Sequence, residues 1–295
     1  MAEKKTQTAH PAAPRRGRAR GVAQAPRQPD PLAADLRAAI AEAYPWLRAL
    51  GNRTIESPYG RFVVDRELPN VWDANHLQHP RAATTAELDA LLAMMDEVFA
   101  HCDHRMVMTD GFTPDGVVAR LLADGFRELD ATIQMALVGE LAEVAGPRLD
   151  FVPVGDEPTW AELYRLMRAD HEEGRRTHDM VVPDAVTRSM IVALRRKAGP
   201  VTFYLAELAG RPVAYAAKVE CPNGLGMIED VFTLPDVRSK GIASALIAHI
   251  LGRLRSEIPA RPVFLGAHAL QGAKHLYRRL GFQPVMVTRE FLRQD

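Results

Sequence analysis

One segment combines residue types and spacing suited to binding a phosphate-bearing ligand. It reads Arg238-Ser-Lys-Gly241-Ile-Ala243 and lies between the end of a predicted strand near Thr233 and the start of an amphipathic helix. Small residues let the backbone approach a ligand closely. The free N–H groups at a helix N-terminus face outward with the positive end of the helix dipole. The segment therefore predicts a seat for a pyrophosphate, with an ordinary strand-to-helix turn as the alternative.

Other motifs that bind phosphates or metals are missing from the sequence. The chain has neither the G-x-x-x-x-G-K-[ST] loop nor the G-x-G-x-x-G turn. Its two His-x-x-His pairs, His76 with His79 and His101 with His104, lack a third ligand at helical or hairpin spacing. We therefore expect no metal.

The phosphate segment resembles the acyl-CoA-binding motif [RQ]-x-x-G-x-[GA] of the GCN5-related N-acetyltransferase (GNAT) superfamily. Arg238, Gly241 and Ala243 occupy its three fixed positions, and the Val-Phe-Thr-Leu-Pro run before it resembles the family's fourth strand. Downstream, residues 273–282 match the family's A-x-x-L-Y-x-x-x-G-F ending through Tyr277. The resemblance covers about residues 150–295. One departure is Leu270, where the family often has an Asn that bonds the coenzyme or the nearby chain.

The resemblance implies roles for these residues with acetyl-CoA as co-substrate. Backbone edges of the fourth strand would pair with the pantetheine amides, and an N–H there would polarise the thioester carbonyl. Tyr277 would protonate the leaving thiolate, because a phenol with a pKa near 10 stays protonated; a packed core aromatic is the alternative. The implied acetyl-CoA contacts are Val231, Phe232, Thr233, Arg238, Ser239, Lys240, Gly241, Ile242, Ala243 and Ser244.

A general base is also needed, because an acceptor ammonium must lose a proton before it attacks. Glu229 and Asp230 are the candidates, and neighbouring strand residues point to opposite faces of a sheet. Glu229 shares parity with Thr233, so we favour Glu229 for the cleft. Asp230 takes its place if a bulge shifts the register, and either carboxylate is otherwise solvent-facing.

The segment from Arg168 to Met180 is unusually polar, and we expect it to be a loop between two helices. In family members that connection often covers the acceptor site, so the resemblance implies substrate contacts there, against the alternative of a solvated loop. The residues concerned are His171, Glu172, Arg175, Arg176 and His178.

The elements that must position these residues follow from apolar spacing. We expect strands at 151–154, 201–208, 213–220, 225–233 and 263–267, helices at 157–173, 183–196 and from 241, and then a helix holding Tyr277 and a last strand. The three central strands form an antiparallel meander. The predicted class is α/β (α+β), with a mixed, mostly antiparallel sheet flanked by helices.

A second, earlier copy of this module is indicated by an internal repeat. Residues 114–137 and 270–292 both read as a short helix, a Gly-Phe pair and an alternating strand, and the two Gly-Phe pairs lie 156 positions apart. Strands are expected at 53–57, 61–65, 71–77 and 105–109, and Thr84 with Glu87 fits a capping box that opens a helix to about 100. This copy has no [RQ]-x-x-G-x-[GA] loop, and Leu121 replaces the Tyr, so we interpret it as degenerate.

Composition limits the remaining possibilities. The chain has 295 residues, 37 basic and 37 acidic, with 47 % hydrophobic residues and two cysteines. No long apolar run indicates a membrane span, and Cys102 and Cys221 make no disulfide framework, which favours a reducing, cytoplasmic compartment. Residues 1–30 carry seven bases and two acids and have no apolar period. We expect a disordered, solvated basic tail rather than a nucleic-acid contact.

These inferences give three regions: the tail at 1–30, a degenerate GNAT-like module at 31–145, and a catalytic domain at 148–295, with 138–150 as a linker. The predicted reaction is acetyl transfer from acetyl-CoA to a primary amine by direct attack in a ternary complex. No cysteine adjoins the motif, so no acetyl-enzyme is expected. The acceptor stays open among small molecules, peptides and proteins, and so does the oligomeric state. The rival is a non-catalytic acyl-CoA-sensing or protein-binding module.

Overall fold

The computed structural model describes residues 31–294 except 130, 179–180 and 257. The basic tail expected over 1–30 lies outside the described residues. Among the described residues, no helix combines the length and the apolar character needed to cross a bilayer.

The C-terminal half contains the strands, meander and helices that its apolar spacing predicts. The expected bounds agree with the observed ones within a few residues, with one exception at the end of the first helix. The elements are β7 (Asp150–Pro153), α4 (Glu157–His178), α5 (Asp184–Arg195), β8 (Val201–Leu208), β9 (Arg211–Glu220), β10 (Gly226–Thr233), the short 3₁₀ helix η2 (Pro235–Val237), α6 (Ile242–Arg255), β11 (Val263–His268), α7 (Ala273–Arg279) and β12 (Gln283–Gln294).

The exception is the polar segment expected to be a loop, because α4 continues through it to His178. The prediction of a loop was wrong because polarity was read as the end of a helix. Arg, Glu, Ala and Asp are compatible with a solvent-facing helix, and Arg168 and Glu172 form an ion pair of 3.6 Å at i, i+4 spacing.

The N-terminal half repeats the strand–helix order in a shorter form. Its elements are α1 (Pro31–Ala49), β1 (Arg53–Ser57), β2 (Gly60–Val64), η1 (Trp72–Ala74), β3 (His76–Gln78), α2 (Thr85–Val98), β4 (His104–Thr109), α3 (Asp115–Ala123), β5 (Arg127–Glu128) and β6 (Thr132–Leu137). The capping box of Thr84 and Glu87 is present at the start of α2. The strand expected over 71–77 is shorter, because 72–74 form the 3₁₀ helix η1. Helix α1 was not predicted.

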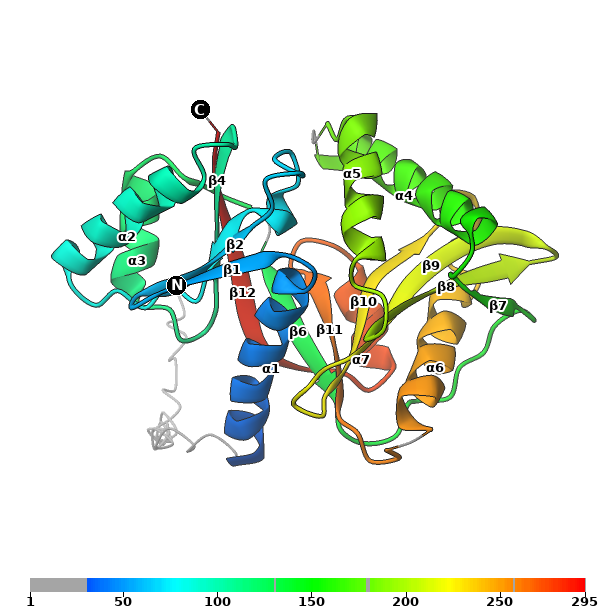
Figure 1. Ribbon diagram of the computed structural model, residues 1–295. Helices are drawn as coiled ribbons and strands as arrows, with labels where there is room; N and C mark the ends of the chain where they lie inside the picture. Colours follow the sequence, from blue (N-terminus) through cyan, green and yellow to red (C-terminus); the bar gives the residue numbers. More distant parts are fainter. Residues whose placement is uncertain (1–30, 130, 179–180, 257, 295) are drawn as a thin grey trace, which may run out of the picture.

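All the strands join one sheet, in the order β1-β2-β3-β4-β12-β6-β11-β10-β9-β8-β7, with β5 on the side of β12. Among the named strands of the described residues, β3–β4 and β10–β11 are the only parallel pairs, which confirms the mixed, mostly antiparallel class. Figure 1 shows α2 and α3 beside the strands of the N-terminal half and α4, α5 and α6 around the strands of the C-terminal half. Helix α1 lies between the two groups.

The two halves exchange strands at the centre of the sheet. β6, from the N-terminal half, pairs with β11 along its whole length. β12, from the C-terminal half, pairs with β6 through residues 283–288 and with β4 through residues 289–294. Each half therefore depends on the other half's last strand to complete its sheet.

Helix α1 packs with the C-terminal half although it begins the described chain. Its buried residues Ile40, Tyr44 and Leu47 belong to the large hydrophobic core that also contains β8, β9, β10 and α6. The core of the N-terminal half is separate and lies among α2, α3, β2 and β4, with Phe291 from β12. The two halves therefore divide differently in space than along the sequence, because α1 belongs to the first half in sequence and to the core of the second half in space.

Candidate active site

A β-bulge in β10 determines where the two candidate carboxylates lie. Glu229 pairs with Ala217 and Phe232 pairs with Tyr215, so β10 advances three residues while β9 advances two. Asp230 takes up the extra residue with a φ of 54°. The expectation that Glu229 and Asp230 face opposite sides was wrong, because the bulge breaks the alternation. Both side chains line one cavity of about 40 Å³.

After the parallel pairing ends, β10 separates from β11. The two strands pair only through residues 226–228 of β10, whereas β9 follows β10 as far as Thr233. The edge of β10 that faces β11 is therefore free of strand partners from Glu229 to Thr233, among the residues that the structure describes. Val231, Phe232 and Thr233 all lie on this free stretch. The Thr233 hydroxyl is buried and has no hydrogen-bond partner in the described chain.

The loop after β10 leads directly into the N-terminus of α6. Ser239 and Gly241 have positive φ values of 62° and 83°, and Gly241 caps the helix. The first N–H groups of a helix have no intrahelical acceptor, so those of Ile242, Ala243 and Ser244 face outward beside this loop. An anion is favoured here by the helix dipole. The predicted residues Arg238 to Ser244 are thus gathered at one place, next to the free edge of β10.

The Arg238 side chain is bonded to protein groups. Its Nε donates to the Thr233 carbonyl at 2.8 Å, and its two terminal nitrogens meet the Glu173 carboxylate at 2.6 and 2.5 Å. Arg238 therefore ties the loop to β10 and to α4, and the predicted binding of an anion would fall to the backbone N–H groups of the loop.

Gly241 has a close neighbour from the linker between the two halves. A Cβ on Gly241 would lie 2.4 Å from the carbonyl oxygen of Ala145 and 3.0 Å from the Cα of Gly146. Glycine is required here by the positive φ and by the chain's own backbone, independently of any ligand. A substitution at Gly241 thus disturbs the fold as well as the loop.

Glu229 is the centre of a buried ion cluster. Its side chain is 13 % exposed, and its Oε1 accepts a 2.8 Å bond from Arg48 of α1. Burial raises the pKa of Glu229 to about 7, and the positive charge of Arg48 opposes that rise. The protein around Asp230 desolvates its carboxyl group and also raises its pKa, although the residue as a whole is exposed. Solvent screens Asp230 more strongly, so Glu229 is the better candidate for a base that titrates near neutrality.

Tyr277 lies on α7, 4 % exposed. Burial raises the pKa of its phenol above the ordinary value of 10, and the negative charge of Glu229 adds to the rise. The hydroxyl therefore stays protonated over the physiological range, as an acid requires.

Two of the residues expected to contact substrate from the 168–180 segment make contacts within the protein. The Nδ1 of His171 lies 2.8 Å from the Thr187 hydroxyl of α5, and burial lowers the pKa of this histidine to about 4. Glu172 faces Arg168. The side chains of Arg175, Arg176 and His178 lie outside the described residues.

Sequence reasoning missed several residues of the cleft. Arg48, Asp73 and Lys197 line the same cavity as the predicted residues Glu229 and Asp230. Asp170 of α4 accepts a 3.1 Å bond from the Tyr215 hydroxyl, and burial raises the pKa of Asp170 to about 6. No local motif marks these residues, because they come from separate elements of both halves.

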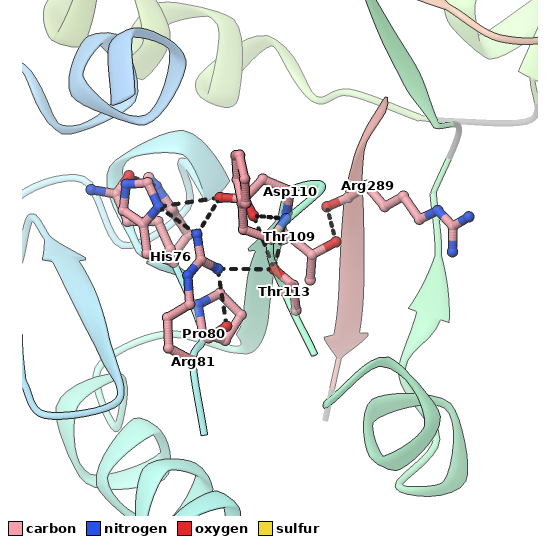
Figure 2. Close-up of polar contacts among 10 residues, drawn as sticks. His76, Pro80, Arg81, Thr109, Asp110, Thr113 and Arg289 are labelled. Carbon is pink, nitrogen blue, oxygen red and sulfur yellow. Dashed lines mark hydrogen bonds and ion pairs between the residues drawn. The ribbon is translucent and has the colours of Figure 1, made fainter. Parts of the chain in front are cut away.

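The N-terminal half has a counterpart of this site that its own side chains fill. β3 pairs with β4 only as far as Gln78, and the next residue, His79, has a φ of 53°, much like Asp230. Arg81 bonds Asp110 at 2.6 Å and Thr113 at 3.2 Å (Figure 2). The cavity here is only about 10 Å³, and α1 covers it. Within the described chain, no cluster of three metal-ligating side chains occurs, here or elsewhere.

Comparison with known families finds a match for most of the C-terminal half. Residues 160–282 match the model of the family described as "Acetyltransferase (GNAT) family". A search of curated proteins finds no match to this sequence.

Solved structures resemble nearly the whole chain. A GCN5-related N-acetyltransferase from Kribbella flavida is 18 % identical with a TM-score of 0.65, and the match covers 87 % of this chain and 95 % of that one. A conserved protein of unknown function from Staphylococcus epidermidis has 15 % identity and a TM-score of 0.63, with coverage of 83 % and 94 %. A tandem GNAT protein from the clavulanic acid biosynthesis pathway has 14 % identity and a TM-score of 0.54, with coverage of 87 % and 95 %. At these identities the likeness shows the fold alone.

Proposed function

We propose that the C-terminal half, whose residues 160–282 match the model of the acetyltransferase (GNAT) family, moves an acetyl group from acetyl-CoA to a primary amine by direct attack in a ternary complex. The observation that carries this proposal is the separation of β10 from β11 beside the N-terminus of α6. A free strand edge suits the amides of a pantetheine arm, and outward-facing helix N–H groups suit its pyrophosphate.

The residues present fit acetyl-CoA along the free edge of β10 and at the N-terminus of α6. The free edge at Val231, Phe232 and Thr233 would pair with the pantetheine arm, and an N–H at the bulge would polarise the thioester carbonyl. The pyrophosphate would be held by backbone groups of Arg238, Ser239, Lys240, Gly241, Ile242, Ala243 and Ser244. The buried, unpartnered Thr233 hydroxyl is a further polar group on this path.

Proton transfers are assigned to two groups. Glu229 takes the proton of the acceptor ammonium, directly or through water, with Asp230 as the alternative at the same cavity. Tyr277 gives a proton to the departing thiolate, and its raised pKa keeps the hydroxyl protonated until that step. The cavity at Glu229 lies between the halves, so the acceptor amine would enter there.

Direct attack is favoured over a covalent acetyl-enzyme. The thiolate is the reactive form of cysteine. Both cysteines are free and buried, and burial raises the pKa of Cys102 to about 11 and of Cys221 to about 12. Neither thiol is therefore ionised enough to act as a nucleophile at neutral pH.

The test measures release of free thiol from acetyl-CoA in the presence of a panel of small amines, peptide N-termini and lysine-containing proteins. Acetyl-CoA binding is measured in parallel by calorimetry. We expect binding and amine-dependent thiol release. Binding without release for any amine would favour the rival function, an acyl-CoA-sensing module, and absence of binding would reject both.

A further inference from the structure

We propose that Arg48, on α1 of the N-terminal half, is a positioning residue that holds the Glu229 carboxylate in the acceptor cleft, so that the N-terminal half supplies part of the C-terminal site. This inference rests on the proposed function, in which Glu229 accepts the proton of the acceptor amine. It assigns the first half a direct part in the chemistry, although that half lacks an acetyl-CoA loop of its own.

The Arg48 guanidinium is held at three points. Its Nη2 donates to Glu229 Oε1 and to the Tyr44 hydroxyl, each at 2.8 Å, and its Nη1 donates to Asp73 Oδ2 at 2.5 Å. The planar fork of an arginine fixes direction as well as distance. With 15 % exposure at Arg48 and 13 % at Glu229, the pair is largely shielded from solvent. Glu229 therefore has little freedom to rotate while Arg48 is present.

Helix α1 is anchored firmly enough to fix this arginine. Leu47, directly before Arg48, is buried in the core of the C-terminal half. Tyr44 lies one turn earlier on the same side of α1, and the Arg48 guanidinium carbon is 4.9 Å from the centre of its ring. The Nδ2 of Asn223, in the β9–β10 turn, donates to the Ala39 carbonyl at 2.8 Å. Arg48 on α1 and Glu229 on β10 are thus both carried by elements of the same hydrophobic core.

The other charges around Glu229 come from several elements and mostly disfavour its ionisation. Asp230 on β10 and Asp73 on η1 are negative, and Lys197 between α5 and β8 is positive. Glu290 on β12 acts on Arg48, and the phenols of Tyr44 and Tyr277 feel the charge of Glu229. Arg48 supplies the largest favourable charge for ionised Glu229. Without it, a buried carboxylate beside two others stays protonated at neutral pH.

Opposite charge changes around one carboxylate give opposite predictions. In Arg48→Met the acidic limb of the pH profile of kcat/KM should move to higher pH by about one unit or more, which is a loss of about tenfold on that limb. In Asp73→Asn a negative neighbour is lost, so the limb should move to lower pH. Arg48→Lys keeps the charge and should restore part of the wild-type profile. A merely structural defect would not move the limb in two directions.

The matched control is Arg196→Met, because Arg196 also bridges the halves. It pairs with Asp65 and, at 2.8 Å, with Glu67, away from the cleft. This variant should lose stability in thermal melts and leave the acidic limb in place. A shift as large as that of Arg48→Met would overturn the proposal.

A readout without turnover separates this inference from the proposed function. The carboxyl carbon of Glu229 is followed by NMR in glutamate-labelled full-length protein, and its signal is assigned by its loss in Glu229→Gln. The midpoint of the pH titration of this carbon should rise in Arg48→Met or, if that variant fails to fold, in the uncharged, polar Arg48→Gln. An unchanged midpoint in a folded variant rejects the role of Arg48. If no amine is acetylated but the midpoint moves, the hold on Glu229 stands and the proposed function fails.

Discussion

Thr132 and Thr288 are direct partners across the antiparallel strands β6 and β12, and the Thr288 hydroxyl lies 3.5 Å from the Thr132 carbonyl. They are 156 residues apart, the same offset that separates Gly125 from Gly281. Equivalent residues of two repeats face each other in an antiparallel pair only at an approximate twofold axis. The two threonines therefore mark the centre about which the halves repeat.

The repeat extends to the residue at which the halves differ chemically. The N–H of Phe126 donates to the Leu121 carbonyl and that of Phe282 to the Tyr277 carbonyl, each at 3.0 Å. Both glycines between them have positive φ. Leu121 thus stands where Tyr277 stands, fully buried and without a hydroxyl. The N-terminal half keeps the packing of this helix and lacks the phenol hydroxyl.

Tyr277→Phe tests the proton donor. The ring and its packing stay, so acetyl-CoA affinity should be nearly constant while kcat falls by about 10²–10⁴-fold, the usual range for positioned acid catalysis. The matched control is Tyr204→Phe, a buried tyrosine of β8 whose ring packs edge-on against His249, and it should leave kcat unchanged. Equal kcat in Tyr277→Phe and wild type would remove Tyr277 from the mechanism.

Ser244→Glu tests the anion seat with opposite effects on stability and binding. A carboxylate in the first turn of α6 interacts favourably with the helix dipole, by about 0.3–1 kcal/mol, so the melting temperature should not fall. The same negative charge repels a pyrophosphate, and calorimetry should show acetyl-CoA affinity at least about tenfold weaker. Ser256→Glu, just beyond the other end of α6, should leave the affinity unchanged. Equal affinity in Ser244→Glu and wild type contradicts the assigned seat.

Gly241→Ala tests whether the linker at Ala145 requires a glycine at position 241. The new Cβ would lie 2.4 Å from the Ala145 carbonyl and would force a left-handed backbone on alanine, so unfolding should become easier by at least about 1 kcal/mol. Gly252→Ala is the matched control in the same helix, where a Cβ meets nothing within 4 Å, and it should stabilise by about 0.5–1 kcal/mol. Urea unfolding of both variants measures the difference. A neutral Gly241→Ala would mean that the linker moves freely.

Glu290→Gln tests the cost of charging the buried cleft. Burial raises the pKa of Glu290 to about 7, against the opposing charge of Arg48. A carboxyl whose folded pKa is raised contributes stability below its unfolded value near 4.3, and that contribution is lost as the pH rises through about 7. The variant should therefore melt higher than wild type at pH 8 and about equally at pH 5. A higher melting temperature at pH 5 alone would reverse the sign and contradict the assignment.

Splitting the chain tests the exchange of strands. Residues 148–295 alone lose β6, which leaves the edges of β11 and β12 unpaired and removes α1 from the core. Unpaired edges associate with other chains, so size-exclusion chromatography should show aggregates rather than a monomer. Co-expression with residues 31–147 should restore a soluble complex. A soluble, well-folded monomer of the C-terminal fragment would show that the exchange is dispensable.

The sequence by itself determined the local elements of the C-terminal half and the family that they resemble. Apolar periods predicted both bounds of β8 and the apolar stripe of α6. They could do so because alternation and helical spacing report which side chains a single element buries. The capping box at Thr84 and the repeat about the Gly-Phe pairs are likewise short-range patterns. The loop from Arg238 to Ala243 could be placed at a helix N-terminus for the same reason.

Only the tertiary structure decided how the two halves share a site. Alternation along β10 assigned Glu229 and Asp230 to opposite faces, and the bulge that joins them depends on pairing with β9. Helix α1 has an interior Pro45 and no partner nearby in sequence, so its place in the other half's core had no local signal. Arg48 and Glu229 are 181 residues apart. Their contact depends on the packing of α1 and the exchange of strands, which no window of sequence contains.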